Sequence, residues 1–243
     1  MRSLQERVKD YWTQRAPYFS AVRRNELEDG ITDRWIEEIT RYLPEGRTLD
    51  ILDAGTGTGY FSIILTALGH RLTGIDLTPA MIGEARKMAE QSDIEADFLL
   101  MDAQATTFDD GSFDAIVTRN LTWTLPDPEK AYRDWYRILR KGGVLINFDA
   151  DYARNVRNEN QKNSYIDPEG VYGHFGMTAD LVREDAEITL AMPAGMLRRP
   201  LWDVSTAKAI GFTDAGADEE AGKRILQERD LSDAPLFLFW ARK

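Results

Sequence analysis

The stretch DAGTGTG, residues 53–59, carries glycine at every second position from Gly55 and ends a short run of apolar residues, Leu49, Ile51, Leu52 and Ala54. An apolar run of this length that ends in glycines is typical of a buried parallel strand. Apolar residues then recur at helical spacing over residues 61–68. Glycines let a ligand approach backbone N–H groups closely, and a helix N-terminus adds partial positive charge. The stretch therefore predicts a strand, a ligand-binding loop and a helix.

The same alternation continues outward from this unit. Strands are expected at residues 71–75, 98–101, 113–118 and 144–148, helices from Thr78 and over 128–139, and a turn at 141–143. Strand alternating with helix predicts a doubly wound parallel sheet. The chain, 1–243, is expected to be a single domain, divided into an N-terminal helical segment interrupted at Pro17 (1–46), a core (47–150), a lid or cap (151–200) and the end of the sheet (201–243).

An acid follows the second expected strand. Asp76 lies 17 residues after Gly59, where a carboxylate can accept both hydroxyls of an adenosine ribose. The dinucleotide fingerprint would require a sixth-position glycine, but counting from Gly55 that position is Tyr60. Asp53 would also repel a pyrophosphate, whereas it suits a ligand with an amino group. These residues favour a cationic nucleoside over NAD and disfavour an oxidoreductase.

Five segments in this order resemble one family. They are residues 52–59, 74–81, 101–103, 113–117 and 137–143. The sequence resembles the class I, Rossmann-like S-adenosylmethionine-dependent methyltransferases, in the broad group that includes the ubiquinone and menaquinone methyltransferases. The resemblance implies a seven-stranded, mostly parallel α/β sheet whose last strand is reversed, with residues 212–217 and 236–241 as the last two strands. It also implies S-adenosyl-L-methionine as cofactor and S-adenosyl-L-homocysteine as product.

The resemblance also implies cofactor-binding residues: Asp53, Gly55, Thr56, Gly57, Gly59, Asp76, Leu77, Asp102, Ala103, Asn120 and Tyr18. Asp76 would bind the ribose, Leu77 the adenine face and Asp102 the adenine amino group, while Asn120 would lie near the methyl group. Simpler roles stay open: the glycines could serve a tight turn, Asp102 could cap a helix, Asn120 could cap a turn, and Tyr18 could pack within its helix.

Residues on the substrate side are expected to be Tyr11, Trp123, Asp149, Tyr152 and His174. Methyl transfer is an in-line displacement that chiefly requires alignment, so a general base is optional. The catalytic residue therefore stays unknown, with Asp149, Tyr152 and His174 as candidates. Asp149 is alternatively a solvated loop acid, His174 a surface or packed residue, and Trp123 a packing residue. No cluster has metal-ligand spacing, and no metal is expected.

The composition restricts the partners. Acids outnumber bases 41 to 30, giving a net charge of −11, and nucleic-acid binders usually carry a basic face. The chain has no cysteine, no apolar run long enough to span a bilayer and no apolar leader segment, so a cytoplasmic protein without membrane contact is expected. The leading hypothesis is a small-molecule methyltransferase. The alternatives are a protein or nucleic-acid methyltransferase and a non-catalytic cofactor-binding module.

Overall fold

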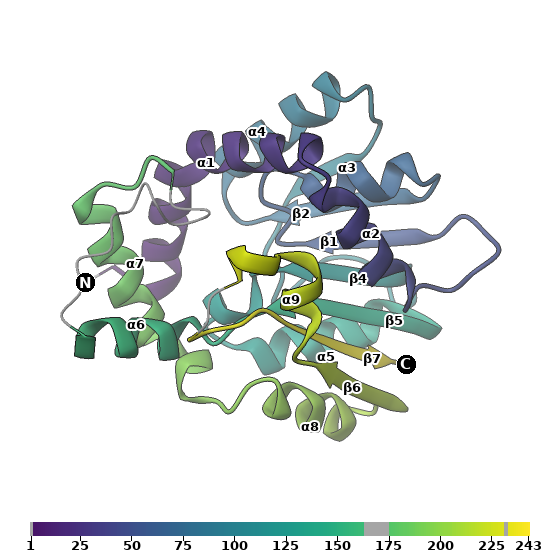
Figure 1. Ribbon diagram of the computed structural model, residues 1–243. Helices are drawn as coiled ribbons and strands as arrows, with labels where there is room; N and C mark the ends of the chain where they lie inside the picture. Colours follow the sequence, from purple (N-terminus) through teal and green to yellow (C-terminus); the bar gives the residue numbers. More distant parts are fainter. Residues whose placement is uncertain (1, 163–174, 231–232) are drawn as a thin grey trace.

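The computed structural model of the protein describes residues 2–162, 175–230 and 233–243. Its centre is a seven-stranded sheet of order β3-β2-β1-β4-β5-β7-β6 (Figure 1). The strands are β1 (Asp50–Ala54), β2 (Arg71–Asp76), β3 (Asp97–Leu100), β4 (Phe113–Arg119), β5 (Leu139–Asp149), β6 (Asp214–Asp218) and β7 (Phe237–Arg242). The predicted doubly wound sheet is confirmed.

Strand β1 lies in the interior of the sheet. It pairs in parallel with β2 and β4, so that Ile51 stands beside Leu72 on one side and Ala115 on the other. Strand β7 runs antiparallel to both β5 and β6, which confirms the reversed last strand. The carboxyl ends of the parallel strands β1, β2, β3 and β4 therefore meet at one edge, where open α/β sheets bind ligands.

Helices cover both faces of the sheet (Figure 1). They are α1 (Leu4–Glu28), α2 (Ile31–Thr40), α3 (Tyr60–Ala67), α4 (Pro79–Gln91), α5 (Pro128–Ile138), α6 (Tyr152–Lys162), α7 (Ala179–Ala191), α8 (Leu201–Ile210) and α9 (Ala221–Ile225), with short 3-10 turns η1 (Thr122–Thr124), η3 (Pro193–Met196) and η4 (Gln227–Arg229). Ile51 joins the core formed with α2 and α3, and Leu52 joins the core formed with α5 and α8. Successive β1 side chains thus serve opposite faces, as the pleat requires.

The expected interruption at Pro17 is wrong, because α1 runs through it from Leu4 to Glu28. Proline has a helix-compatible φ but no N–H, so it removes one backbone hydrogen bond and favours a bend rather than an end. The helix changes direction partway along in Figure 1. Its early part packs on α7 and its later part lies along α4. Packing on two elements maintains the helix across the proline.

The expected turn at residues 141–143 is also wrong, because β5 begins at Leu139 and continues through it. The register with β4 jumps from Phe113–Leu139 to Ala115–Val144, so β5 accommodates extra residues as a bulge. Gly142 has φ +78°, a conformation that suits glycine in such an irregularity.

Residues 151–200 contain α6, α7 and η3, which pack on one another. Helix α7 also packs on α1, where Tyr11, Met177, Leu181 and Ile188 form a small apolar core. The division of the chain into a core and a cap stays a prediction. In the part of the chain that the structure describes, no helix combines the length and apolar character needed to cross a membrane.

Candidate active site

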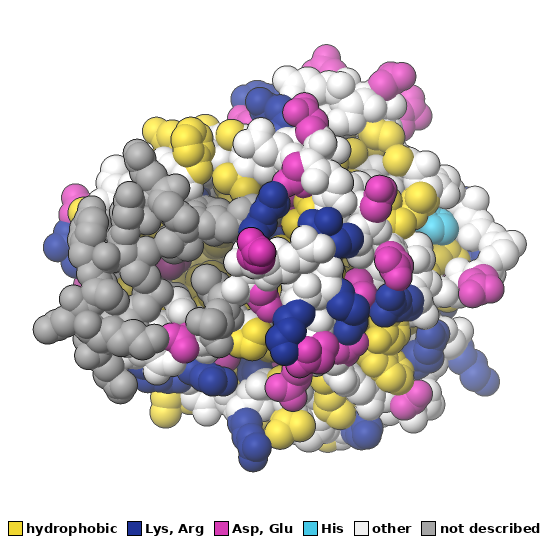
Figure 2. Space-filling view, in the orientation of Figure 1, with side chains coloured by type: hydrophobic (Ala, Val, Ile, Leu, Met, Phe, Trp, Pro, Cys, Tyr) yellow, Lys and Arg dark blue, Asp and Glu magenta, His cyan; other side chains and the backbone are white. Residues whose placement is uncertain are grey.

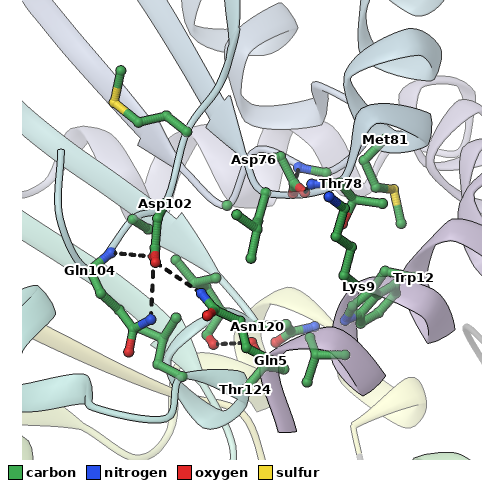
Figure 3. A pocket seen from close by; sticks show the side chains of 18 of the residues that line it. Gln5, Lys9, Trp12, Asp76, Thr78, Met81, Asp102, Gln104, Asn120 and Thr124 are labelled. Atoms are coloured by element: carbon green, nitrogen blue, oxygen red, sulfur yellow. Dashed lines mark hydrogen bonds between the residues drawn. The ribbon is translucent and has the colours of Figure 1, made fainter. Parts of the chain in front are cut away.

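A cleft opens at the carboxyl ends of the central strands, and α1 covers it (Figure 3). Its walls include the sequence-predicted residues Gly55, Gly57, Asp76, Leu77, Asp102, Ala103 and Asn120. Four separate loops after β1, β2, β3 and β4 supply them. The cleft therefore brings together most of the residues expected to bind the cofactor.

The glycine loop needs glycine for conformational and steric reasons. Gly55 and Gly57 have φ values of +67° and +54°, in the left-handed region that side chains disfavour. A Cβ on Gly55 would also lie 2.7 Å from a methyl carbon of Leu121. The Thr56 amide donates to the Ile75 carbonyl at 2.9 Å and holds the loop against β2. The backbone is thereby presented to the cleft without side chains in the way.

Asp53 is buried under this loop. Its Oδ2 accepts hydrogen bonds from the Thr56 hydroxyl at 2.7 Å, the Ser62 hydroxyl at 2.8 Å and the Ser62 amide at 3.0 Å. The carboxylate thus ties the loop to the first turn of α3. This geometry favours a loop-stabilising role for Asp53 over direct contact with a ligand ammonium group.

Burial raises the pKa of Asp53 from 3.8 to about 6, which predicts a pH effect on stability. The pKa of Asp53 in the folded state lies above its value in the unfolded state. The folded state therefore binds the proton more tightly at any pH between these two pKa values. The contribution of Asp53 to the free energy of unfolding should therefore fall as pH rises from 4 to 7, by up to about 3 kcal/mol. Denaturant unfolding of wild type and Asp53→Asn at both pH values measures it. A stability difference between the two proteins that does not change with pH would contradict the assignment.

Asp76 links the glycine loop to the start of α4. Its Oδ2 accepts the Gly57 amide at 3.1 Å and its Oδ1 accepts the Thr78 amide at 2.8 Å. Each carboxylate oxygen can accept a further hydrogen bond, which matches the two hydroxyls of a ribose. Burial raises the pKa of Asp76 above its ordinary value. Thr78 precedes α4 as expected, although its side chain makes no capping hydrogen bond.

Asn120 stands directly after β4. It lines both the cleft and a second cavity that adjoins the cleft and is described below. It adopts φ +56°, and its amide donates to the Phe148 carbonyl at 2.8 Å. Its buried Oδ1 has no hydrogen-bond partner within the described residues. An unpaired buried acceptor normally requires a partner. The oxygen would suit the cationic end of S-adenosylmethionine, so the residues present fit that cofactor.

The aromatic residues that α1 turns toward the glycine loop are Trp12 and Phe19, which line both cavities. Tyr18, the predicted residue, instead packs its ring on Phe175 at 6.0 Å and is 43% exposed. One residue along a helix turns a side chain by about 100°. The sequence interpretation thus chose the neighbouring face of the helix, and only the recurrence of Val8, Trp12 and Phe19 on one face signalled the face that lines the cleft.

A second cavity of about 280 Å³ adjoins the cleft and shares Trp12, Phe19 and Asn120 with it. Helices α1, α6 and α7, the turns η1 and η4 and the segment before β7 contribute to its walls. The predicted substrate residues Tyr11, Trp123 and Tyr152 line it together with Met177, and so does Asp185, which sequence reasoning missed. We name it the acceptor cavity. The rings of Trp123 and Tyr152 contact each other with centroids 5.0 Å apart.

Two tyrosines of this cavity are proton donors rather than bases at neutral pH. Burial raises the pKa of both Tyr11 and Tyr152 well above the ordinary value. The hydroxyl of Tyr11 lies 3.6 Å from the Met177 sulfur.

Asp149 is fully buried, so the solvated alternative is wrong. Its carboxylate accepts hydrogen bonds from the Thr122 hydroxyl, the Trp123 amide at 2.8 Å and Arg199 at 2.8 Å. Arg199 also pairs with buried Asp203. This network favours a structural role, in which Asp149 fixes η1 and hence the Trp123 wall of the acceptor cavity. His174 lies outside the described residues.

A buried charge cluster stands where the cavities meet. Glu26 pairs with Arg23 and Arg119, so the cluster carries one excess positive charge. Although burial acts to raise the pKa of Glu26, Arg119 and Arg23 lower it to about 2. Both arginines line the space beside the glycine loop, where they would neutralise the methionine carboxylate of the cofactor. Among the described residues, no group of three or more His, Asp or Glu side chains could hold a metal ion.

The sheet order, the glycine loop and the acids at the ends of β2 and β3 define a nucleoside-binding α/β protein of the methyltransferase class. A family model described as a methyltransferase domain matches residues 52–147. Phosphatidylethanolamine N-methyltransferase of Cereibacter sphaeroides is 31% identical over 156 residues, covering 60% of this chain and 75% of that protein. The chain belongs to the class I S-adenosylmethionine-dependent methyltransferases.

Two further comparisons agree with this assignment. Demethylmenaquinone methyltransferase of Thermus thermophilus is 36% identical over 133 residues, covering 54% of this chain but only 60% of that protein. The structure of Haemonchus contortus phosphoethanolamine N-methyltransferase 2 with S-adenosyl-L-methionine aligns with a TM-score of 0.59 at 19% identity, covering 84% of this chain and 51% of that one. At this identity the structural likeness concerns the fold.

Proposed function

We propose that the protein transfers the methyl group of S-adenosylmethionine to a small molecule held in the acceptor cavity. One observation carries the proposal: the acceptor cavity meets the cofactor cleft at Asn120, the position expected for the methyl end of the cofactor. Its volume, about 280 Å³, is near the lower end of the roughly 300–1,000 Å³ of small-molecule sites. Residues of three helices and two 3-10 turns line it on several sides, which supports a small acceptor over a folded macromolecule.

The chain's own residues would contribute alignment and exclusion of water. The bound cofactor supplies a methyl group on a sulfonium, an excellent leaving group. Trp12 and Phe19 shield the junction of the two cavities from α1, and Trp123 and Tyr152 present an apolar, aromatic surface to the acceptor. Enclosure of this kind aligns reactants and excludes water. Asp185 adds a carboxylate to the lining of the acceptor cavity.

The surface charge disfavours a nucleic-acid acceptor. On the face in Figure 2, Lys and Arg side chains are interspersed with Asp and Glu. A polyanion would require a basic surface and would give steep salt dependence.

Titration calorimetry with S-adenosylmethionine and NADH, followed by detection of S-adenosylhomocysteine, tests the proposal. We expect binding of S-adenosylmethionine only, and product formation with one acceptor of a panel. The first acceptors to test are a demethylated menaquinone and phosphatidylethanolamine, because the relatives' names indicate these classes. Cofactor binding without product across a broad panel would favour a non-catalytic module. Preferential binding of NADH would overturn the proposal.

Replacement of Asp76 by Ala should weaken binding of S-adenosylhomocysteine by about 1.5–3 kcal/mol, or roughly 10- to 150-fold, because it removes charge-assisted hydrogen bonds to the ribose. Calorimetry of both proteins measures the change. Asp97→Ala, which removes an exposed acid of β3, is the matched control and should bind as wild type does. Equal affinity of the Asp76→Ala variant and wild type would place the ribose elsewhere.

A further inference from the structure

A side chain from α1 reaches the adenine end of the cleft. Gln5 donates from Nε2 to Oδ2 of Asp102 at 2.9 Å (Figure 3). The other oxygen of Asp102, Oδ1, accepts the Gln104 amide at 2.9 Å and the Gln104 side chain at 3.3 Å. Asp102 is therefore fixed from two sides, by its own loop and by α1.

The position of Gln5 is itself well determined, because the first turns of α1 are anchored. Ser3 and Glu6 form a reciprocal capping box at the start of the helix. Arg7 makes a two-pronged ion pair with Glu184 of α7, at 2.8 and 2.9 Å, and reaches Glu187 as well. These contacts hold Gln5 beside the cleft.

Gln5 and Asp102 together offer two hydrogen-bond acceptors at this end of the cleft. When Gln5 donates its N–H, its carbonyl oxygen Oε1 is an acceptor, and Oδ2 of Asp102 can accept one more hydrogen bond. The 6-amino group of adenine carries two N–H donors, so two neighbouring acceptors complement it. A 6-oxo purine presents an oxygen at that position, which the Asp102 carboxylate cannot bond and which leaves the Gln5 carbonyl without a donor. Sites built to bond an N–H group reject analogues that lack it.

We propose that Gln5 is a specificity-determining residue of the cofactor site, which reads the adenine amino group together with Asp102. The proposal rests on the cofactor placement given under the proposed function. The N-terminal turns of α1 would then help to recognise the base and would also cover the cleft.

The test compares two ligands, S-adenosylhomocysteine and its deaminated analogue S-inosylhomocysteine, by calorimetry on the full chain. We expect Gln5→Ala to weaken binding of S-adenosylhomocysteine about 10-fold, the scale of one such hydrogen bond. Binding of the inosyl analogue should change less than about twofold, so the preference for adenine falls about 10-fold. Gln14→Ala is the matched control, because Gln14 is exposed on the same helix; both affinities should stay at the wild-type values.

Three results would overturn the proposal. Equal weakening of both ligands would show that Gln5 only supports the helix, and unchanged affinities would show that it does not contact the base. Tighter binding of S-adenosylhomocysteine to Gln5→Ala would show that Gln5 obstructs the site. Failure of the wild-type protein to bind S-adenosylhomocysteine would instead contradict the cofactor site itself, so the two failures are distinguishable.

Discussion

Replacement of Gly57 by Val should abolish measurable binding of S-adenosylmethionine and S-adenosylhomocysteine, with a loss of at least about 100-fold. Gly57 adopts φ +54°, which a β-branched residue strongly disfavours, and its amide is bonded to Asp76. A Cβ would lie 3.8 Å from the Phe19 ring, so the protein without cofactor has room for it. The loss would therefore arise from the shifted loop and from a side chain that stands between the backbone and the cofactor. Calorimetry measures it.

A matched control separates binding from general strain. Gly46 has φ +80°, and a Cβ there would meet nothing within 4 Å. Gly46→Val should thus strain the backbone comparably while leaving both affinities unchanged. Wild-type affinity in Gly57→Val would contradict the proposed approach of the cofactor to this loop.

Replacement of Arg199 by Ala should lower the free energy of unfolding by about 3–5 kcal/mol, and Tm by roughly 6–20 °C. Arg199 is the cation between buried Asp149 and Asp203, and Tyr132 donates to Asp203 at 2.6 Å. Without the guanidinium, two carboxylates would remain buried without a counter-ion. Thermal and denaturant unfolding measure the change.

Arg198→Ala is the matched control, since Arg198 is the exposed neighbour and its loss should change Tm little. The triple variant Arg199→Leu, Asp149→Asn, Asp203→Asn should recover much of the lost stability, because no unpaired charge remains buried. A stability of Arg199→Ala equal to that of Arg198→Ala would show that the network does not stabilise this edge of the sheet.

Local patterns in the sequence predicted the central unit of the fold. An apolar run before DAGTGTG and helical spacing after it predicted β1 and α3, and the resemblance added the reversed β7. These features are encoded within one element or its immediate neighbours. Asp76 and Asp102 could likewise be placed, because each lies at the end of a strand and the carboxyl ends of parallel strands meet at one edge.

Tertiary packing decided the rest of the site. Which face of α1 turns to the cleft depends on how the helix packs on α7 and α4, so local reasoning chose Tyr18 where Phe19 lies. Asp149 and Arg199 are 50 residues apart in sequence, and Gln5 and Asp102 are 97 apart. Such pairs form only when the fold brings separate elements together. The strength of each pair then depends on the neighbouring residues that exclude water from it, and local sequence patterns do not specify those neighbours. The sequence by itself determined at which strand ends the proposed nucleoside site lies, whereas the folded chain decided which side chains line it.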